Sequence, residues 1–293
     1  MAEALSRLDA WLNHDTPMHH NSTHLQIKMR CLFSCLMLTI ALFSTSAHAA
    51  FDQTHAKFTA LLRAHVVWIN GGSASRVDYA AIKTNPSLLT QYLSEVAAVT
   101  QQQYNDFSKA QQLAFLINAY NAYTIQFILT KYPDLKSIKD LGSLFSNPWK
   151  KKLFPLLGEK RSLDEIEHGM IRKPGVFDDP RIHIAVNCAS IGCPALRDEA
   201  YVADRLDAQL DDSVRRFLSD RSRNRADDKG LWVSKIFDWY AEDFEKQAGS
   251  VQAWLAPYAN LLSDDAQTQA AVRSESLRLH YLDYDWALND LQK

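Results

Sequence analysis

A histidine and two cysteines form the cluster of this sequence best suited to chemistry. Four residues lie between His183 and Cys188, four more lie between Cys188 and Cys193, and Pro194 follows directly. The segment 181–186 (RIHIAV) is typical of a short buried strand, so Cys188 would follow a strand end, where many folds place reactive residues. Three kinds of site are compatible with this cluster: a structural Cys188–Cys193 disulfide, a nucleophilic Cys188 with a histidine base, or a metal site. The spacing matches no established zinc pattern, so we assign no metal ion.

A second cluster falls on an expected helix over 163–172. Ser162 and Glu165 form a capping box at the start of this helix. Glu165, His168 and Arg172 follow at intervals of three and four residues, so their side chains can touch on one face. A carboxylate beside a histidine raises the pKa of the imidazole and fixes its tautomer, which suits a general base. A solvated ladder of ion pairs would give the same pattern.

Two asparagines form the third cluster. Asn118 and Asn121 lie one turn apart in the segment 108–131, which is apolar on nearly all sides and predicts a central buried helix. Buried amides need partners, because an unpaired one costs about 1–3 kcal/mol. The two side chains therefore either tie the helix to a neighbouring loop, or line a pocket and orient a catalytic histidine.

The remaining elements must position these three clusters. Helical periodicity and capping predict further helices over 51–69, 85–99, 201–218, 239–246 and 250–262. Strands are expected over 231–237 and 277–284. There is no internal repeat and no linker after residue 50. We therefore expect a single, helix-rich α+β domain around a central buried helix, with a small β-sheet.

Composition narrows the class of protein. The chain has 293 residues, of which 47% are hydrophobic and 23% charged, and this excludes a disordered or fibrous protein. The 32 Lys and Arg against 34 Asp and Glu argue against a nucleic-acid partner. Because there is no glycine-rich phosphate-binding motif, we assign no nucleotide and no other cofactor. The expected partner is a small molecule or a peptide.

The N-terminus has the features of an export leader. Arg30 precedes an apolar run over 32–43, and the small-x-small pattern Ala47-His48-Ala49 follows. The run is too short to span a membrane, which takes roughly 20 residues, so we expect no transmembrane segment once the leader is removed. We predict an extension over 1–28, a signal peptide over 29–49, a mature chain over 50–293, and a periplasmic or secreted location.

Four motifs resemble one family. They are 115–121 (FLINAYN), 162–169 (SLDEIEHG), 179–183 (DPRIH) with 187–194 (NCASIGCP), and 284–289 (YDWALN). Together they are similar to domain of unknown function 547, as an exported bacterial member, over about 77–293. The resemblance implies no reaction, but it directs attention to the residues of the motifs. A weaker likeness to papain-like and transglutaminase-like thiol enzymes is only architectural, because Asn118 stands where those enzymes would need a cysteine.

These observations predict a polar pocket. Its expected residues are Asn118, Asn121, Glu165, His168, Arg172, Arg181, His183 and Cys188. As an enzyme, the protein would catalyse thiol-dependent acyl transfer or amide hydrolysis. Cys188 would be the nucleophile, His183 or His168 the base, and Glu165 the group that orients it. The alternative is a non-catalytic envelope protein that binds a small molecule or peptide and has a structural Cys188–Cys193 disulfide.

Overall fold

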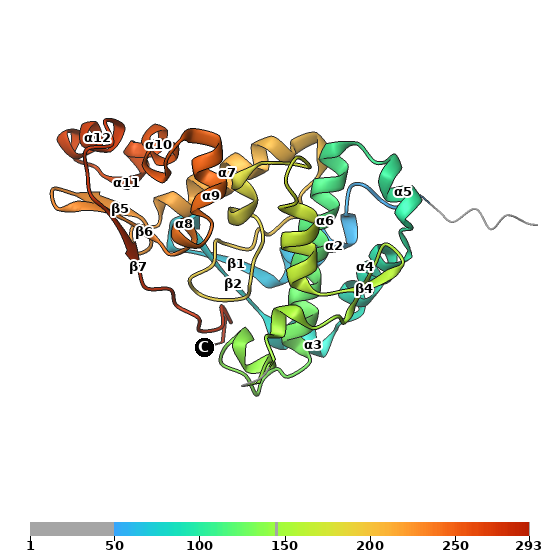
Figure 1. The fold of residues 1–293 in the computed structure, drawn as a ribbon. Helices are drawn as coiled ribbons and strands as arrows, with labels where there is room; N and C mark the ends of the chain where they lie inside the picture. The colour runs from blue at the N-terminus through green and yellow to red at the C-terminus, as the bar shows by residue number, and fades with distance from the viewer. Residues whose placement is uncertain (1–49, 144–145, 293) are drawn as a thin grey trace, which may run out of the picture. The chain divides into compact units, whose positions relative to one another are not determined.

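Helix α6 (Lys109–Leu129) is the buried centre of the fold (Figure 1). Ser108 and Gln111 form a capping box at its start. Apolar side chains then occupy nearly every face, and the helix is buried from Leu113 to Ile125. The expected central helix over 108–131 is confirmed.

The computed structural model describes residues 50–143 and 146–292. From Phe51 onward the described chain forms one compact unit. The expected leader over 1–49 lies outside the described residues. Within the described residues, no helix combines the length and the apolar character needed to cross a membrane.

The N-terminal part of this unit packs against α6. Its helices are α2 (Ala56–His65), α3 (Tyr79–Thr84), α4 (Ser87–Ala98) and α5 (Gln101–Asp106). The expected helix over 51–69 is wrong at its end, because its last four residues, all β-branched or aromatic, form strand β1 (Val66–Ile69). This strand pairs antiparallel with β2 (Ala74–Val77). Gly71 and Gly72 join the two strands with φ values of 65° and 89°, which favour glycine.

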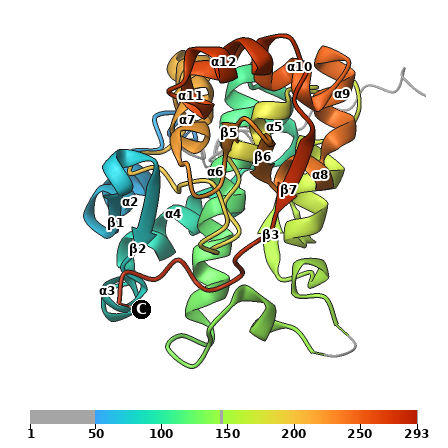
Figure 2. The ribbon, with the colours of Figure 1, turned by 90° about the vertical axis from the view of Figure 1, so that its left-hand side faces the viewer.

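The C-terminal part surrounds a second core. Strands β5 (Arg225–Asp227), β6 (Gly230–Ser234) and β7 (Leu279–Leu282) form a three-stranded sheet in which β7 runs parallel to β6, as Figure 2 shows. The helices of this part are α7 (Leu206–Ser219), α8 (Ile236–Trp239), α9 (Ala241–Ala248), α10 (Val251–Leu255), α11 (Ala259–Leu262) and α12 (Ala266–Arg273). Small antiparallel or mixed sheets among many helices confirm the α+β class.

Short elements connect the two parts. Strands β3 (Phe154–Leu156) and β4 (Glu159–Arg161) form a hairpin, followed by the π-helical η5 (Glu165–Ile171). The expected strand over 181–186 is wrong, because that segment contains the 3₁₀-helix η6 (Pro180–Ile184). Pro180 stands at the first helical position, and Asp179 accepts a hydrogen bond from the backbone N–H of Arg181, which together favour a helical start.

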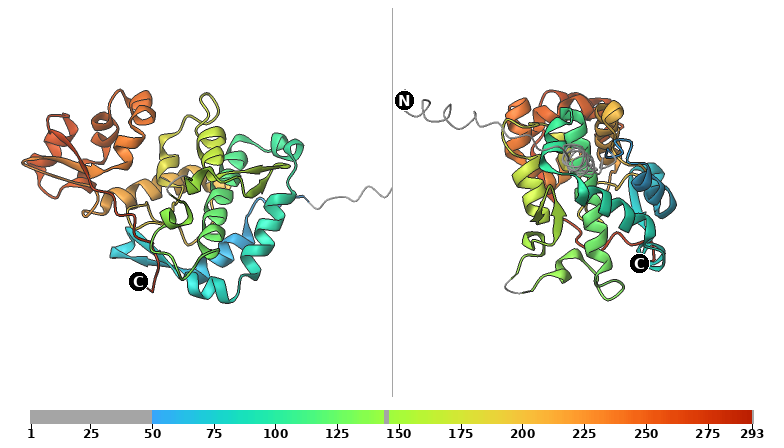
Figure 3. Two further views of the ribbon diagram at one scale, coloured as in Figure 1. Left: turned by 60° about the horizontal axis from the view of Figure 1, so that its bottom comes forward. Right: turned by 90° about the vertical axis from the view of Figure 1, so that its right-hand side faces the viewer.

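The C-terminal segment, residues 283–292, returns to the N-terminal part, beside the β1–β2 hairpin (Figure 3). Val77 bridges Asp290, and the hydroxyl of Tyr79 donates to Asn289 Oδ1 at 2.7 Å. The same segment pairs with residues 187–194, the cysteine loop, through a bridge between Ser190 and Leu288. The chain end therefore holds the loop that carries both cysteines.

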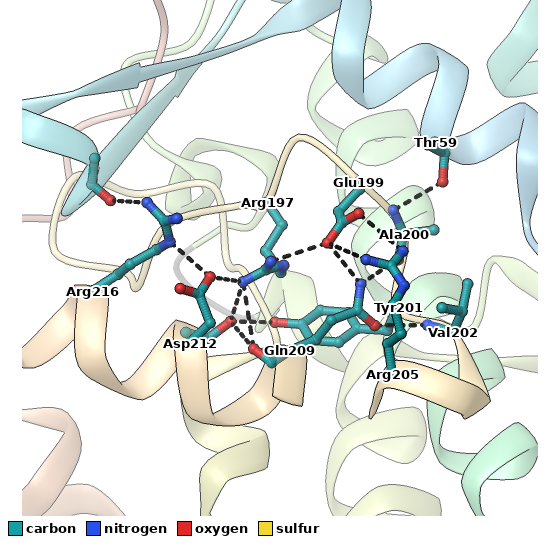
Figure 4. Close-up of polar contacts among 12 residues, drawn as sticks. Thr59, Arg197, Glu199, Ala200, Tyr201, Val202, Arg205, Gln209, Asp212 and Arg216 are labelled. Carbon is teal, nitrogen blue, oxygen red and sulfur yellow. Dashed lines mark hydrogen bonds and ion pairs between the residues drawn. The ribbon is translucent and has the colours of Figure 1, made fainter. Parts of the chain in front are cut away.

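A network of charged side chains fixes the stretch after that loop to α7 (Figure 4). Arg197 pairs with Asp212 at 2.5 Å and with Glu199 at 3.0 Å. Although burial opposes it, hydrogen bonds from Gln209, Arg205 and Arg197 lower the pKa of Glu199 to about 2. The network keeps Glu199 ionised and holds residues 197–202 against the helix.

Candidate functional site

A cavity of about 220 Å³ lies where η5, the cysteine loop, α8 and the C-terminal segment meet. Polar and aromatic side chains line it together. The polar residues of its wall are Asn147, Asp164, Glu167, His168, His183, Cys188 and Cys193. Of the predicted site residues, the structure thus brings three together in one wall: His168, His183 and Cys188.

The two cysteines lie in direct contact in this wall. Both are free thiols in this structure, and their side chains are hydrogen-bonded to each other. The backbone N–H of Cys188 donates to Cys193 Sγ at 2.9 Å. Cys188 Sγ lies 3.1 Å from the hydroxyls of both Ser190 and Tyr284. Cys188 is partly exposed and Cys193 is buried, so Cys188 is the thiol that a bound molecule can reach.

The contact between the two thiols shifts their pKa values in opposite directions. The hydrogen bond to Cys193, together with burial, raises the pKa of Cys188 well above its ordinary value. Although burial opposes it, hydrogen bonds from Cys188 and Tyr284 lower the pKa of Cys193 to about 7. The pair therefore loses its first proton more readily than an isolated buried thiol would, because the remaining proton is shared between the two sulfur atoms.

His183 is oriented by a carboxylate that the sequence did not reveal. Its Nε2 donates to Asp243 Oδ2 at 2.7 Å, and the neutral ring then carries its lone pair on Nδ1. Burial lowers the pKa of His183, so the ring is neutral at pH 7. The hydrogen bond from His183, followed by that from Arg172, holds the pKa of Asp243 well below its usual range. Nδ1 is buried at the cavity wall and has no hydrogen-bond partner among the described residues.

His168 has the opposite arrangement. Arg172 donates through Nε to Asp243 Oδ2 and through a terminal nitrogen to His168 Nδ1, both at 2.7 Å. An arginine cannot accept a hydrogen bond, so the neutral ring of His168 carries its proton on Nε2. The lone pair of His168 is thus occupied, whereas that of His183 is not.

Two carboxylates, those of Asp164 and Glu167, lie in the cavity wall, whereas the predicted Glu165 is directed elsewhere. Glu165 forms the predicted capping box with Ser162 and pairs with Lys152 at 2.5 Å. Glu167 is buried and accepts the hydroxyl of Tyr240 at 2.7 Å. The ring of Tyr240 in turn stacks on His183, with 3.8 Å between ring centroids.

The two asparagines of α6 lie outside the cavity wall and bind loop backbone. Asn118 exchanges two hydrogen bonds with the backbone of Tyr201, at 2.7 and 2.9 Å. Asn121 donates to the carbonyl of Ala185 and accepts the N–H of Asn187. The first of the two interpretations, in which they tie the helix to loops, describes this geometry. Through Asn187, Asn121 holds the residue that precedes Cys188.

Arg181 also lies outside the cavity wall. It pairs with three carboxylates, those of Asp179, Asp207 and Asp211, at 2.6–2.8 Å. The pairs with Asp207 and Asp211 connect η6 to α7. Within the residues that the structure describes, no group of three or more His, Cys, Asp or Glu side chains could hold a metal ion.

Several residues of the site were not predicted from the sequence. Glu167 belongs to the motif 162–169 and Tyr284 to the motif 284–289, but neither was predicted as a site residue. Tyr240 and Asp243 gave no signal beyond an expected helix over 239–246. Asp243 is 60 residues from His183 in the chain, so only tertiary packing shows their pairing.

The fold and the site define a helix-rich α+β protein with a thiol pair in an aromatic cavity. A family model described as "Protein of unknown function, DUF547" matches residues 104–218. This match confirms the resemblance to the domain of unknown function 547 family over residues 104–218. The match includes three of the four motifs, and 284–289 lies outside it. No curated protein and no solved structure matches the chain.

Proposed function

We propose that this protein is an exported thiol enzyme that catalyses acyl transfer or amide hydrolysis in the cavity. One observation carries the proposal: two free thiols in direct contact lie in the same cavity wall as His183, a histidine oriented by Asp243. A nucleophile and an oriented base at one cavity are the groups that such a reaction needs. The leader-like sequence over 29–49 supports a periplasmic or secreted location.

Cys188 is the proposed nucleophile because it is the more exposed thiol. Its proton passes to the Cys193 thiolate, and Cys188 Sγ attacks the carbonyl carbon of the substrate. The bond to the leaving group then breaks, and the leaving group takes the proton from Cys193, which leaves a thioester on Cys188. The hydroxyls of Ser190 and Tyr284, both 3.1 Å from Cys188 Sγ, are placed to donate to the developing oxyanion.

His183 is the proposed base of the second step. Water, or an acceptor alcohol or amine, attacks the thioester while Nδ1 of His183 takes its proton. Asp243 stabilises the imidazolium that forms, and the proton returns to Cys188 as its thiolate leaves. We assign this role to His183 over His168, because Arg172 occupies the lone pair of His168. Asp243 takes the orienting role that the sequence suggested for Glu165.

The alternative function is a non-catalytic binding protein of the envelope with a Cys188–Cys193 disulfide. The contact between the two thiols supports it, because oxidation would join side chains that already touch. Oxidised cysteines cannot react with an electrophile, so thiol chemistry separates the two functions.

The test is the reaction of the purified chain with p-nitrophenyl acetate. We expect a burst of about one equivalent of p-nitrophenolate, with the acetyl group mapped to Cys188 by mass spectrometry. Cys188→Ser should abolish the burst. His183→Ala should keep the burst and slow the steady-state rate at least about tenfold. His280→Ala is the matched control, because His280 stacks on Trp232 away from the cavity, and it should change neither phase.

Two results would reject the enzyme. The first is a protein that shows no burst and whose cysteines resist iodoacetamide until reductant is added, which would favour the binding protein. The second is acetylation spread over surface lysines, which would show reactivity unrelated to the cavity.

A further inference from the structure

Four aromatic rings form one side of the cavity. Trp149, Trp239, Tyr284 and Trp286 line it. The ring centroids of Trp239 and Tyr284 are 4.9 Å apart, and those of Tyr284 and Trp286 are 4.6 Å apart. The planes of both pairs are inclined at 52°, and Trp149 meets Trp286 at 70°. The inclined rings therefore pack against one another as one cluster that lines the cavity, without forming a parallel stack.

These rings are unusually accessible. Trp239 is 44% exposed, and Trp149 and Trp286 are half-buried. Three of the seven tryptophans of the chain thus lie at one cavity with accessible surface. Apolar side chains gathered around a cavity, and not scattered over the surface, are typical of a binding site.

Two carboxylates complete the same wall. Glu167 accepts the hydroxyl of Tyr240, and neither it nor Asp164 forms an ion pair with any residue that the structure describes. The nearby guanidinium of Arg172 is directed to Asp243 and His168. The cavity therefore presents negative charge beside aromatic faces, with no protein cation directed at Asp164 or Glu167 among the described residues.

Rings and carboxylates together recognise a cation. The faces of aromatic rings attract ammonium groups, and tryptophan attracts them best. One ring of this wall already holds a cation of the protein, because Lys139 Nζ lies 3.8 Å from the ring centroid of Trp286. The volume of about 220 Å³ is below the range of pockets for drug-sized molecules, which begins at about 300 Å³, so the ligand is small.

We propose that the cavity binds a small organic ammonium ion between the four rings and the carboxylates of Asp164 and Glu167. This inference rests on the proposed function and names the class of its substrate. The substrate would be an ester or amide of a small molecule that carries an ammonium group. The cation positions the substrate, and the carbonyl group lies toward Cys188.

Choline and its neutral isostere 3,3-dimethyl-1-butanol test the proposal, because the two differ in charge and little in shape. Binding to the full chain is measured by calorimetry and by tryptophan fluorescence. We expect saturable binding of choline, with the isostere at least about fivefold weaker. Asp164→Asn should weaken choline binding about fivefold or more and leave the isostere unchanged.

Matched variants place the ligand in the cavity. Trp239→Phe should weaken choline binding, whereas Trp232→Phe should not, because Trp232 stacks on His280 outside the cavity wall. Both replacements keep an aromatic ring, and a circular dichroism melt checks that each variant folds.

The outcomes separate this inference from the proposed function. Cys188→Ser should retain choline binding, because the thiol takes no part in it. Choline binding without an acetyl burst would leave the cation site standing and reject the enzyme. A burst without choline binding, or equal binding of choline and its isostere, would reject the cation site.

Discussion

Replacing Asn118 with leucine measures how strongly α6 is tied to the loop at Tyr201. Asn118 is fully buried, and its amide satisfies both the N–H and the carbonyl of Tyr201. Leucine removes both hydrogen bonds and leaves two backbone groups unpaired away from water. Each such group costs about 1–3 kcal/mol, and the better helix propensity of leucine returns only about 0.5 kcal/mol. We expect the free energy of unfolding to fall by about 2–5 kcal/mol.

The assay is urea unfolding followed by circular dichroism under reducing conditions. Gln126→Leu is the matched control, because Gln126 is an exposed residue within the same helix and the replacement introduces the same side chain. It should change the stability by no more than about 0.5 kcal/mol. An Asn118→Leu protein as stable as the parent would refute the reasoning, since the partners of a buried amide would then find replacements at no cost.

Three further predictions concern the thiols, the charged network and the leader. Tyr284→Phe should raise the pH at which iodoacetamide labelling of the thiol pair is half-maximal, because a hydrogen bond from Tyr284 helps to lower the pKa of Cys193. Tyr281→Phe is the control, and an unchanged profile would contradict the role of Tyr284. Because the pKa of Glu199 is lowered on folding from 4.5 to about 2, its ionised form stabilises the fold fully above pH 4.5, and this contribution is lost as the pH falls through about 2. Glu199→Gln should therefore flatten the acid limb of a stability–pH curve, and an unaltered limb would argue against the network. N-terminal sequencing of protein from a Gram-negative periplasm should begin at Ala50, within a residue or two, whereas an intact N-terminus in the cytoplasm would contradict export.

Local patterns in the sequence determined much of the fold and part of the site. The segment 108–131, which is apolar on nearly all sides, predicted α6, because a helix without a polar face must be buried. The pair Ser162 and Glu165 predicted the capping box that these residues form. The family motifs directed attention to His183 and Cys188, which lie in one cavity wall. These features depend on residues a few positions apart, so the sequence carries them directly.

Tertiary structure alone decided the rest. Strand β1 replaced the end of the expected first helix because β2 offers it hydrogen-bond partners. The pairing of His183 with Asp243 depends on α9 packing against η6. The turn geometry of η5 decides that Glu167, and not Glu165, lies in the cavity wall. Electrostatic pairs between residues 60 positions apart leave no periodic trace in a sequence, because their partners are selected by packing and not by spacing.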